Sequence, residues 1–217
     1  MVRKKQREKE IEDVCLFFSS DGTKGFIRRD QYAIALALIV DGDVKVGVLA
    51  CPAYGTDGGT LFYAQRGKGA YEQSIKSFDS SLPTRIYAIS SEKKADYRFA
   101  ESVEGEHGNH EQQNALAQRI GIQQAPIRMD SQVKYGLVAS GQAVLYLRLP
   151  NAQKQSYREN IWDHAAGAII VEEAGGKVSD MDGKPLNLSA NEKMLDNRGV
   201  IVSNGSIHEL VLDSLKV

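Results

Sequence analysis

Residues 32–42 have the sequence YAIALALIVDG, and their pattern of apolar residues is the strongest indication of the architecture. Between Ile34 and Val40 a large apolar residue falls on every second position with Ala or Ile between, so both faces of a strand would be apolar. Ala and Leu also favour a helix. However, Asp41-Gly42 is a tight-turn signal, and valines recur at every second position after it. The stretch therefore predicts a strand in the middle of a sheet that is covered on both faces.

The sequence after this strand changes its rhythm once. A second hairpin is predicted at residues 60–63 and 69–73, so residues 32–73 read as an antiparallel sheet. After residue 83, strand-like segments alternate with helix-like ones, which is typical of a sheet covered by helices. The expected strands are residues 84–90, 126–130, 143–149 and 199–203, and the expected helices are residues 111–120, 132–140, 162–174 and 206–215.

The composition of the 217 residues excludes several classes of protein. The formal net charge is -1, so no basic field favours binding to a nucleic-acid backbone. Two cysteines do not make a disulfide framework, and no apolar run approaches the ~20 residues that cross a bilayer. Residues 1–14 are rich in Lys, Arg and Glu and lack the apolar region of a secretory signal. We expect a cytoplasmic protein that binds neither nucleic acid nor membrane.

Two short motifs carry the candidate chemistry: SDGTKGF at residues 20–26 and WDHAAG at residues 162–167. In the first, Asp21 precedes a glycine turn and Thr23 starts a helix, where backbone N–H groups and the helix dipole favour a phosphate. In the second, Asp163 begins a helix, and a carboxylate there that faces Asp21 would form part of a hard-cation site. Each motif alone is also ordinary turn or N-cap chemistry.

Three further features have plainer interpretations. Residues 180–183 read DMDG like a fragment of a calcium loop, but the remaining ligands of such a loop are absent, so a turn between strands is expected. Glu172 and Glu173 are expected to be a solvated helix end. We expect His164 to be a packed or capping side chain without a ligand role.

The two motifs, in this order and followed by EAGG at residues 173–176, resemble the lithium-sensitive, Mg²⁺-dependent phosphatases of the inositol monophosphatase superfamily. The middle of the chain is similar to the 3'(2'),5'-bisphosphate nucleotidases, the plant and fungal type in particular. HGNH at residues 107–110, DSQVKY at residues 130–135 and YLRLP at residues 146–150 carry this closer similarity. Haloacid-dehalogenase phosphatases compete as a resemblance. They need a nucleophilic Asp where Ser19 stands, and serine cannot form an aspartyl-phosphate.

The resemblance covers residues 21–217 and implies an α/β fold, a layered α+β sandwich of the inositol monophosphatase type. It also implies that much of the N-terminal subdomain is missing. The expected parts are a charged segment (residues 1–20), the rest of an antiparallel-sheet subdomain (residues 21–82) and an α/β nucleotide-binding subdomain (residues 83–217).

Roles carry over from the resemblance residue by residue. It implies that Asp21, Asp163 and the backbone carbonyl of Ser20 are metal ligands. It implies that Gly22 and Thr23 contact the phosphate and that Thr23 also orients the attacking water. The implied nucleotide contacts are His107, Ser131, Lys134, Arg148 and Asp163. The implied cofactor is Mg²⁺. The implied substrate is a small nucleotide bisphosphate, and hydrolysis of 3'-phosphoadenosine 5'-phosphate would give AMP and phosphate. Lys134 and Arg148 supply positive charge that suits phosphates.

The chain departs from the family pattern at residues 18–20, which read FSS where the family has Asp-Pro-Ile. Phe18 therefore replaces a metal-ligating Asp, and no counterpart of the family's Glu ligand and water-orienting Asp is visible in residues 1–17. We expect turnover at least on the order of a thousandfold below that of an intact member. A catalytically inactive nucleotide binder is one alternative, and an inositol polyphosphate or inositol monophosphate phosphatase is another.

The strand at residues 32–40 has a further consequence. In the family, N-terminal helices cover one of its apolar faces. A face left bare would be a large exposed apolar patch, so we expect self-association through this sheet.

Overall fold

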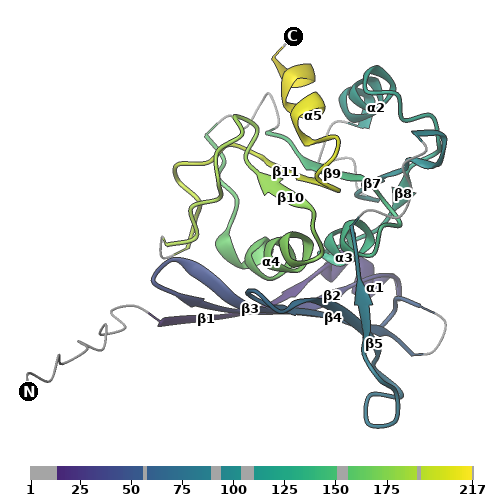
Figure 1. The fold of residues 1–217 in the computed structure, drawn as a ribbon, viewed down its shortest axis with the longest axis vertical. Coiled ribbons are helices and arrows are strands. Elements are labelled where there is room, and N and C mark those ends of the chain that lie inside the picture. The colour runs from purple at the N-terminus through teal and green to yellow at the C-terminus, as the bar shows by residue number, and fades with distance from the viewer. Residues whose placement is uncertain are drawn as a thin grey trace, which may run out of the picture.

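The computed structural model describes residues 14–55, 58–88, 94–103, 110–150, 156–189 and 192–216. The chain is layered, with a pair of helices between two β-sheets and two more helices beyond the second sheet (Figure 1). In these described ranges no helix has the length and apolar character needed to cross a bilayer.

The first sheet is antiparallel throughout and keeps the order of the chain. Its strands are β1 (Val14–Asp21), β2 (Ala33–Val40), β3 (Asp43–Cys51), β4 (Thr60–Gln65), β5 (Gly69–Ser74) and β6 (Thr84–Ile86). The antiparallel sheet predicted for residues 32–73 is therefore confirmed. Residues 14–20, predicted above to belong to the charged N-terminal segment, instead form most of β1, which pairs with β2 from Val14 opposite Val40 to Asp21 opposite Ala33.

One face of this sheet packs against the helices α3 (Val133–Ala139) and α4 (Ala165–Glu173) (Figure 1). The residues of β2 alternate between buried and half-buried, and Ala33, Ala35 and Ala37 are on the buried side. Protein cores are close-packed. Small side chains on this face therefore allow the helices to pack close to the sheet. Together with residues of both helices they form one continuous apolar core.

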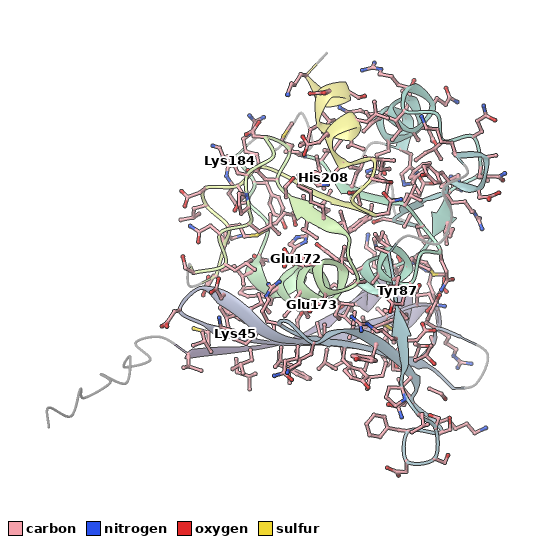
Figure 2. The ribbon with its side chains drawn as sticks, viewed as in Figure 1. Lys45, Tyr87, Glu172, Glu173, Lys184 and His208 are labelled. Atoms are coloured by element: carbon pink, nitrogen blue, oxygen red, sulfur yellow. The ribbon has the colours of Figure 1, made fainter. Side chains whose placement is uncertain are left out.

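The other face of the first sheet is open. On β1, Val14, Leu16 and Phe18 are exposed by 57%, 65% and 69%. Figure 2 shows side chains that project from this face away from the helices. In the part of the chain that the structure describes, the expectation that both faces of the 32–40 strand are covered is therefore wrong. The bare apolar face that the family resemblance implied is present there.

The second sheet is mixed and has the strand order β10-β11-β9-β7-β8. Its strands are β7 (Phe99–Glu101), β8 (Ile127–Arg128), β9 (Leu145–Arg148), β10 (Lys177–Ser179) and β11 (Val200–Ser203). Helices α2 (His110–Arg119) and α5 (His208–Leu215) cover its outer face around a second apolar core. The predicted alternation of strands and helices is confirmed for the later segments. The strand expected at residues 84–90 is instead β6, which pairs with β5 in the first sheet. The helix expected at residues 162–174 is interrupted at His164, because the 3-10 turn η3 (Ile161–Asp163) precedes α4. A second 3-10 turn is η1 (Lys94–Asp96).

The turn expected at residues 180–183 is confirmed. The carboxylate of Asp180 is buried, and its Oδ1 accepts hydrogen bonds from the backbone N–H groups of Asp182 and Lys184 at 2.9 and 2.8 Å. It therefore organises the turn after β10.

The prediction that Glu173 is solvated is wrong. Its carboxylate accepts the backbone N–H groups of Gly67 and Gly69 at 2.8 and 2.9 Å. Glu172 is the more exposed of the pair and forms an ion pair with Arg66 at 2.7 Å. These contacts join the end of α4, where Figure 2 labels both glutamates, to the hairpin between β4 and β5.

A buried histidine predicts how stability changes with pH. His208 at the start of α5 is fully buried, with Ser203 Oγ and Ser179 Oγ each 2.8 Å from its ring nitrogens. Burial, together with the nearby charge of Lys177, lowers its pKa from 6.5 to about 4. The stabilisation from the neutral ring is complete above pH 6.5 and is lost as the pH falls towards 4.

We therefore expect the free energy of unfolding to fall by up to about 1.4 kcal/mol per pH unit in this window. Denaturant unfolding at a series of pH values measures this slope. The variant His208→Gln should show a shallower slope, and equal slopes for the two proteins would contradict the assignment.

Candidate functional site

The first motif forms a tight turn between β1 and a single-turn helix. β1 ends at Asp21, and α1 (Thr23–Ile27) starts directly after Gly22, whose φ is 91°. A Cβ on Gly22 would lie 2.9 Å from Cβ of Ser131 and 3.1 Å from the carbonyl oxygen of Gln31. Only glycine tolerates both this backbone conformation and this close approach. The turn therefore brings the first motif against the segment that begins α3.

The second motif places a carboxylate beside the first. Asp163 closes η3, and its Oδ2 accepts a hydrogen bond from Asn160 Nδ2 at 3.0 Å. Burial raises the pKa of Asp163, and the charge of Asp21 raises it further, although Asn160 and His164 act in the opposite direction. The two carboxylates thus influence one another electrostatically despite their distance in sequence.

A cavity of about 330 Å³ lies where these segments meet. Every predicted site residue that the structure describes lines it, namely Ser20, Asp21, Gly22, Thr23, Ser131, Lys134, Arg148 and Asp163. His107, the remaining predicted nucleotide contact, lies outside the described residues.

Lys134 lines the cavity and supplies a positive charge there. It is only 2% exposed, and its Nζ donates hydrogen bonds to the backbone carbonyls of Met129 at 3.0 Å and Ser131 at 2.7 Å. The ammonium also lies 5.3 Å from the centre of the Tyr146 ring. Burial lowers the pKa of Lys134 to about 8, and the negative charge of Asp21 acts in the opposite direction. An anion in the cavity would favour the charged form.

Arg148 supplies a second cation from the end of β9. Its Nε donates to Oε1 of Glu159 at 3.1 Å. Burial alone would lower the pKa of Arg148, but its neighbours Tyr146 and Glu159 hold it above its ordinary value. The guanidinium is therefore charged at every working pH.

Several lining residues were not assigned a role from sequence. Asp130, Gln132 and Tyr146 lie inside the motifs quoted above, and that position was the only signal for them. Asp130 is nearly buried and pairs with Arg28 at 2.5 Å. His164 is buried, with its Nδ1 2.7 Å from the Tyr135 hydroxyl, so the packed role expected for it is confirmed.

Phe18 is absent from the cavity because of the pleat of β1. Successive side chains of a strand point to opposite faces, so residues 18 and 21 are on different faces of a regular strand. β1 pairs without interruption through Asp21, and Phe18 is 69% exposed on the open face of the sheet. A side chain at position 18 therefore points away from Asp163.

The donor set fits a cation that keeps part of its water shell. Among the described residues no group of three or more His, Cys, Asp or Glu side chains is arranged to hold a metal. Asp21, Asp163 and the backbone at Ser20 nevertheless line one cavity. Mg²⁺ is commonly bound by one or two carboxylates together with waters and substrate phosphates. The residues therefore fit Mg²⁺ bound jointly with a phosphate, and they do not form a closed cage of protein ligands.

Comparison with known proteins identifies the family of the chain. The model of the inositol monophosphatase family matches residues 21–216. The chain belongs to the inositol monophosphatase family.

Relatives of known name are similar over most of the chain. A 3'(2'),5'-bisphosphate nucleotidase of Oryza sativa is 40% identical over 209 residues, which is 90% of this chain and 57% of that protein. One of Schizosaccharomyces pombe is 39% identical over 202 residues, which is 89% of this chain and 56% of that protein. The chain therefore spans little more than half the length of these relatives.

Solved structures agree on the fold. The IMPase of Thermotoga maritima has a TM-score of 0.68 at 26% identity and covers 94% of this chain and 69% of that one. A SaIMPase-II crystallised with 2'AMP bound has a TM-score of 0.68 at 19% identity and covers 97% of this chain and 72% of that one. The expected α/β fold of the inositol monophosphatase type is confirmed.

Proposed function

We propose that the cavity binds a 3'(2'),5'-bisphosphate nucleotide together with Mg²⁺, as part of a phosphatase that releases the 3'-phosphate. For 3'-phosphoadenosine 5'-phosphate the products would be AMP and phosphate. The observation that carries the proposal is one cavity lined by two carboxylates, Asp21 and Asp163, and two cations, Lys134 and Arg148. The relatives named as bisphosphate nucleotidases and the neighbour with 2'AMP bound support the same ligand class.

The charges of the cavity divide the work between them. Lys134 and Arg148 would neutralise phosphate oxygens, and charge-assisted hydrogen bonds of this kind are the stronger ones in proteins. Asp21 and Asp163 cannot bind a phosphate directly, because like charges repel. A cation between them and the phosphate removes that conflict, so the carboxylates are the residues that would hold Mg²⁺. Enzymes of this family are generally metal-dependent.

Hydrolysis forms a bond from a water oxygen to phosphorus, breaks the bond from phosphorus to the ribose 3'-oxygen and leaves that oxygen with a proton. When bound, Mg²⁺ would polarise the phosphoryl group and lower the pKa of a coordinated water. Thr23, at the start of α1, would donate its hydroxyl to the phosphate or orient the water. Ser131 and Lys134 would hold the nucleotide in place.

In the described part of the chain, the cavity offers few carboxylates for catalysis. Of the carboxylates that line the cavity, Asp130 is paired with Arg28, and Asp21 and Asp163 are assigned to the cation. Phe18 provides none, because it lies on the open face of the sheet. We therefore propose a turnover at least on the order of a thousandfold below that of an intact family member, with nucleotide binding retained. Phe18 also favours the alternative that this chain binds nucleotide without hydrolysing it.

A binding experiment tests the function. Trp162 is the single tryptophan of the chain and directly precedes Asp163, so its fluorescence reports on the cavity. We expect saturable binding of adenosine 3',5'-bisphosphate that Mg²⁺ strengthens, and much weaker binding of adenosine. A phosphate-release assay on the same sample separates the enzyme from the silent binder. Equal affinity for the bisphosphate and adenosine would overturn the proposal, and tighter binding of inositol monophosphate would move it to that substrate class.

The proposal also covers the cellular location of the chain and its self-association. We propose that the chain acts in the cytoplasm, and that copies associate through the open face of the first sheet, where β1 exposes Leu16 and Phe18. Light scattering of the purified chain at high concentration tests this association. A uniform monomer would contradict it.

A further inference from the structure

We propose that Glu159 is a positioning residue that holds the guanidinium of Arg148 in the cavity and fixes it relative to His164. The inference rests on the proposed function, because Arg148 matters only if the cavity binds an anion. Glu159 itself does not line the cavity. It is 8% exposed and precedes η3, so it acts from behind the residues that face a ligand.

Both carboxylate oxygens of Glu159 are engaged by different elements. Oε1 accepts from Nε of Arg148, at the end of β9, at 3.1 Å. Oε2 lies 3.3 Å from Nε2 of His164, at the start of α4. One carboxylate therefore joins the strand that carries the cation to the helix that follows Asp163.

The hydrogen-bond roles in this group follow from the chemistry of its members. Although burial alone would raise the pKa of Glu159, the hydrogen bond from His164 and the charge of Arg148 lower it to about 2. The ionised carboxylate only accepts, so Nε2 of His164 carries a proton. The other ring nitrogen, Nδ1, lies 2.7 Å from the hydroxyl oxygen of Tyr135, within hydrogen-bond distance. Arg148, Glu159, His164 and Tyr135 thus form one connected chain.

The backbone of Glu159 is itself held in place. Its carbonyl accepts from the backbone N–H of Met194 at 3.0 Å, and the next residue, Asn160, forms an isolated β-bridge with Lys193. Asn160 also donates to the carboxylate of Asp163 at 3.0 Å. Two successive residues therefore orient a guanidinium and a carboxylate that both line the cavity, which are residues that would hold the phosphate and Mg²⁺.

Glu159→Gln tests the acceptor count. A glutamine is uncharged and offers one oxygen, so it can keep the hydrogen bond from Arg148 only by turning its NH₂ group towards Nε2 of His164. The ion pair with Arg148 is lost in either orientation. We expect the affinity for adenosine 3',5'-bisphosphate to fall by about tenfold or more, the effect of weakening a hydrogen bond to a charged group. Glu172→Gln is the matched control, because it makes the same change in an ion pair with Arg66 that lies outside the cavity. Its affinity should equal that of the wild type.

A double-mutant cycle separates positioning from general destabilisation. If Glu159 acts through Arg148, Glu159→Gln should cost less than about twofold once Arg148→Gln is present. Losses that multiply would overturn the proposal.

A measurement without ligand keeps the inference independent of the function. In ¹⁵N NMR, the Nε–H signal of Arg148, assigned by its loss in Arg148→Gln, should exchange more slowly with water than that of the more exposed Arg66. In Glu159→Gln this protection should fall by about tenfold or more. Rapid exchange in the wild type would overturn the inference even if the variant failed to fold. If the wild type shows no affinity for the bisphosphate, the proposed function fails, and this exchange rate alone decides whether Glu159 positions Arg148.

Discussion

Replacing Lys134 with methionine is expected to weaken the binding of adenosine 3',5'-bisphosphate by about a hundredfold, because a charge-assisted hydrogen bond is lost from a nearly dry site. Methionine has a similar length and fills the same space. The substitution removes the desolvation penalty of the buried ammonium but also leaves the carbonyls of Met129 and Ser131 without this donor. We therefore expect a fold that survives with reduced stability. Fluorescence titration of Trp162 measures the affinity, and thermal unfolding checks the fold.

The matched control for this prediction is Lys45→Met. Lys45, which Figure 2 labels, pairs with Asp43 at 3.2 Å and is not among the residues that line the cavity. Its removal should leave the affinity unchanged. A loss of less than about threefold in Lys134→Met, well short of the loss expected for a charged hydrogen bond, would contradict the assigned role.

The same lysine predicts a pH dependence of binding. Its pKa is lowered to about 8 by burial, with Asp21 and Asp130 acting to raise it and Arg148 to lower it. Below that pH the ammonium is charged and the affinity is complete. Above it the affinity should fall, by at most about tenfold per pH unit, and Lys134→Met should lack this fall.

The second large effect is expected from Gly167→Ala in α4. A Cβ at this position would lie 2.2 Å from Cγ of Tyr135. The side chain of Tyr135 is fully buried and is hydrogen-bonded to His164. Because the clash is with the inner end of the ring, a change of rotamer cannot relieve it cheaply. We expect a loss of about 2–3 kcal/mol in the free energy of unfolding, which is the usual cost of overpacking a core. Denaturant unfolding measures it.

The direction of the expected change in stability distinguishes a packing clash from an effect of helix propensity. In an exposed helix the same exchange favours alanine by about 1 kcal/mol. The matched control is therefore Ala115→Gly on the exposed side of α2, which should destabilise the protein. If Gly167→Ala were as stable as the wild type or more so, the close packing of α3 on α4 would be wrong.

Much of the fold could be predicted because it depends on local pattern. The alternation at residues 34–40 and the turn at Asp41-Gly42 were enough for β2 and β3. The open face of the sheet could not be predicted from that pattern. A strand with two apolar faces has the same sequence pattern whether or not other elements cover both faces. The side on which Phe18 lies likewise depends on the regular pairing of β1 with β2.

The sequence predicted the residues that line the site, but not the residues that hold other side chains or elements in position. Asp21 and Asp163 lie in motifs, and the fold brings them to one cavity. Glu159 and Glu173 carry no such signal. Their roles arise from contacts with Arg148 and with the hairpin at Gly67 and Gly69, which are distant in sequence or on another element. Single acidic residues near helix ends look solvated until tertiary contacts are known.

The central claim is that Asp21 and Asp163 act on one cation beside a phosphate. The most direct measurement is calorimetry of adenosine 3',5'-bisphosphate binding, with and without Mg²⁺, to the wild type, to Asp21→Asn, to Asp163→Asn and to the double variant. We predict that either single substitution removes the strengthening by Mg²⁺, and that the double variant loses no more than a single one. Full strengthening by Mg²⁺ in either single variant would contradict the claim.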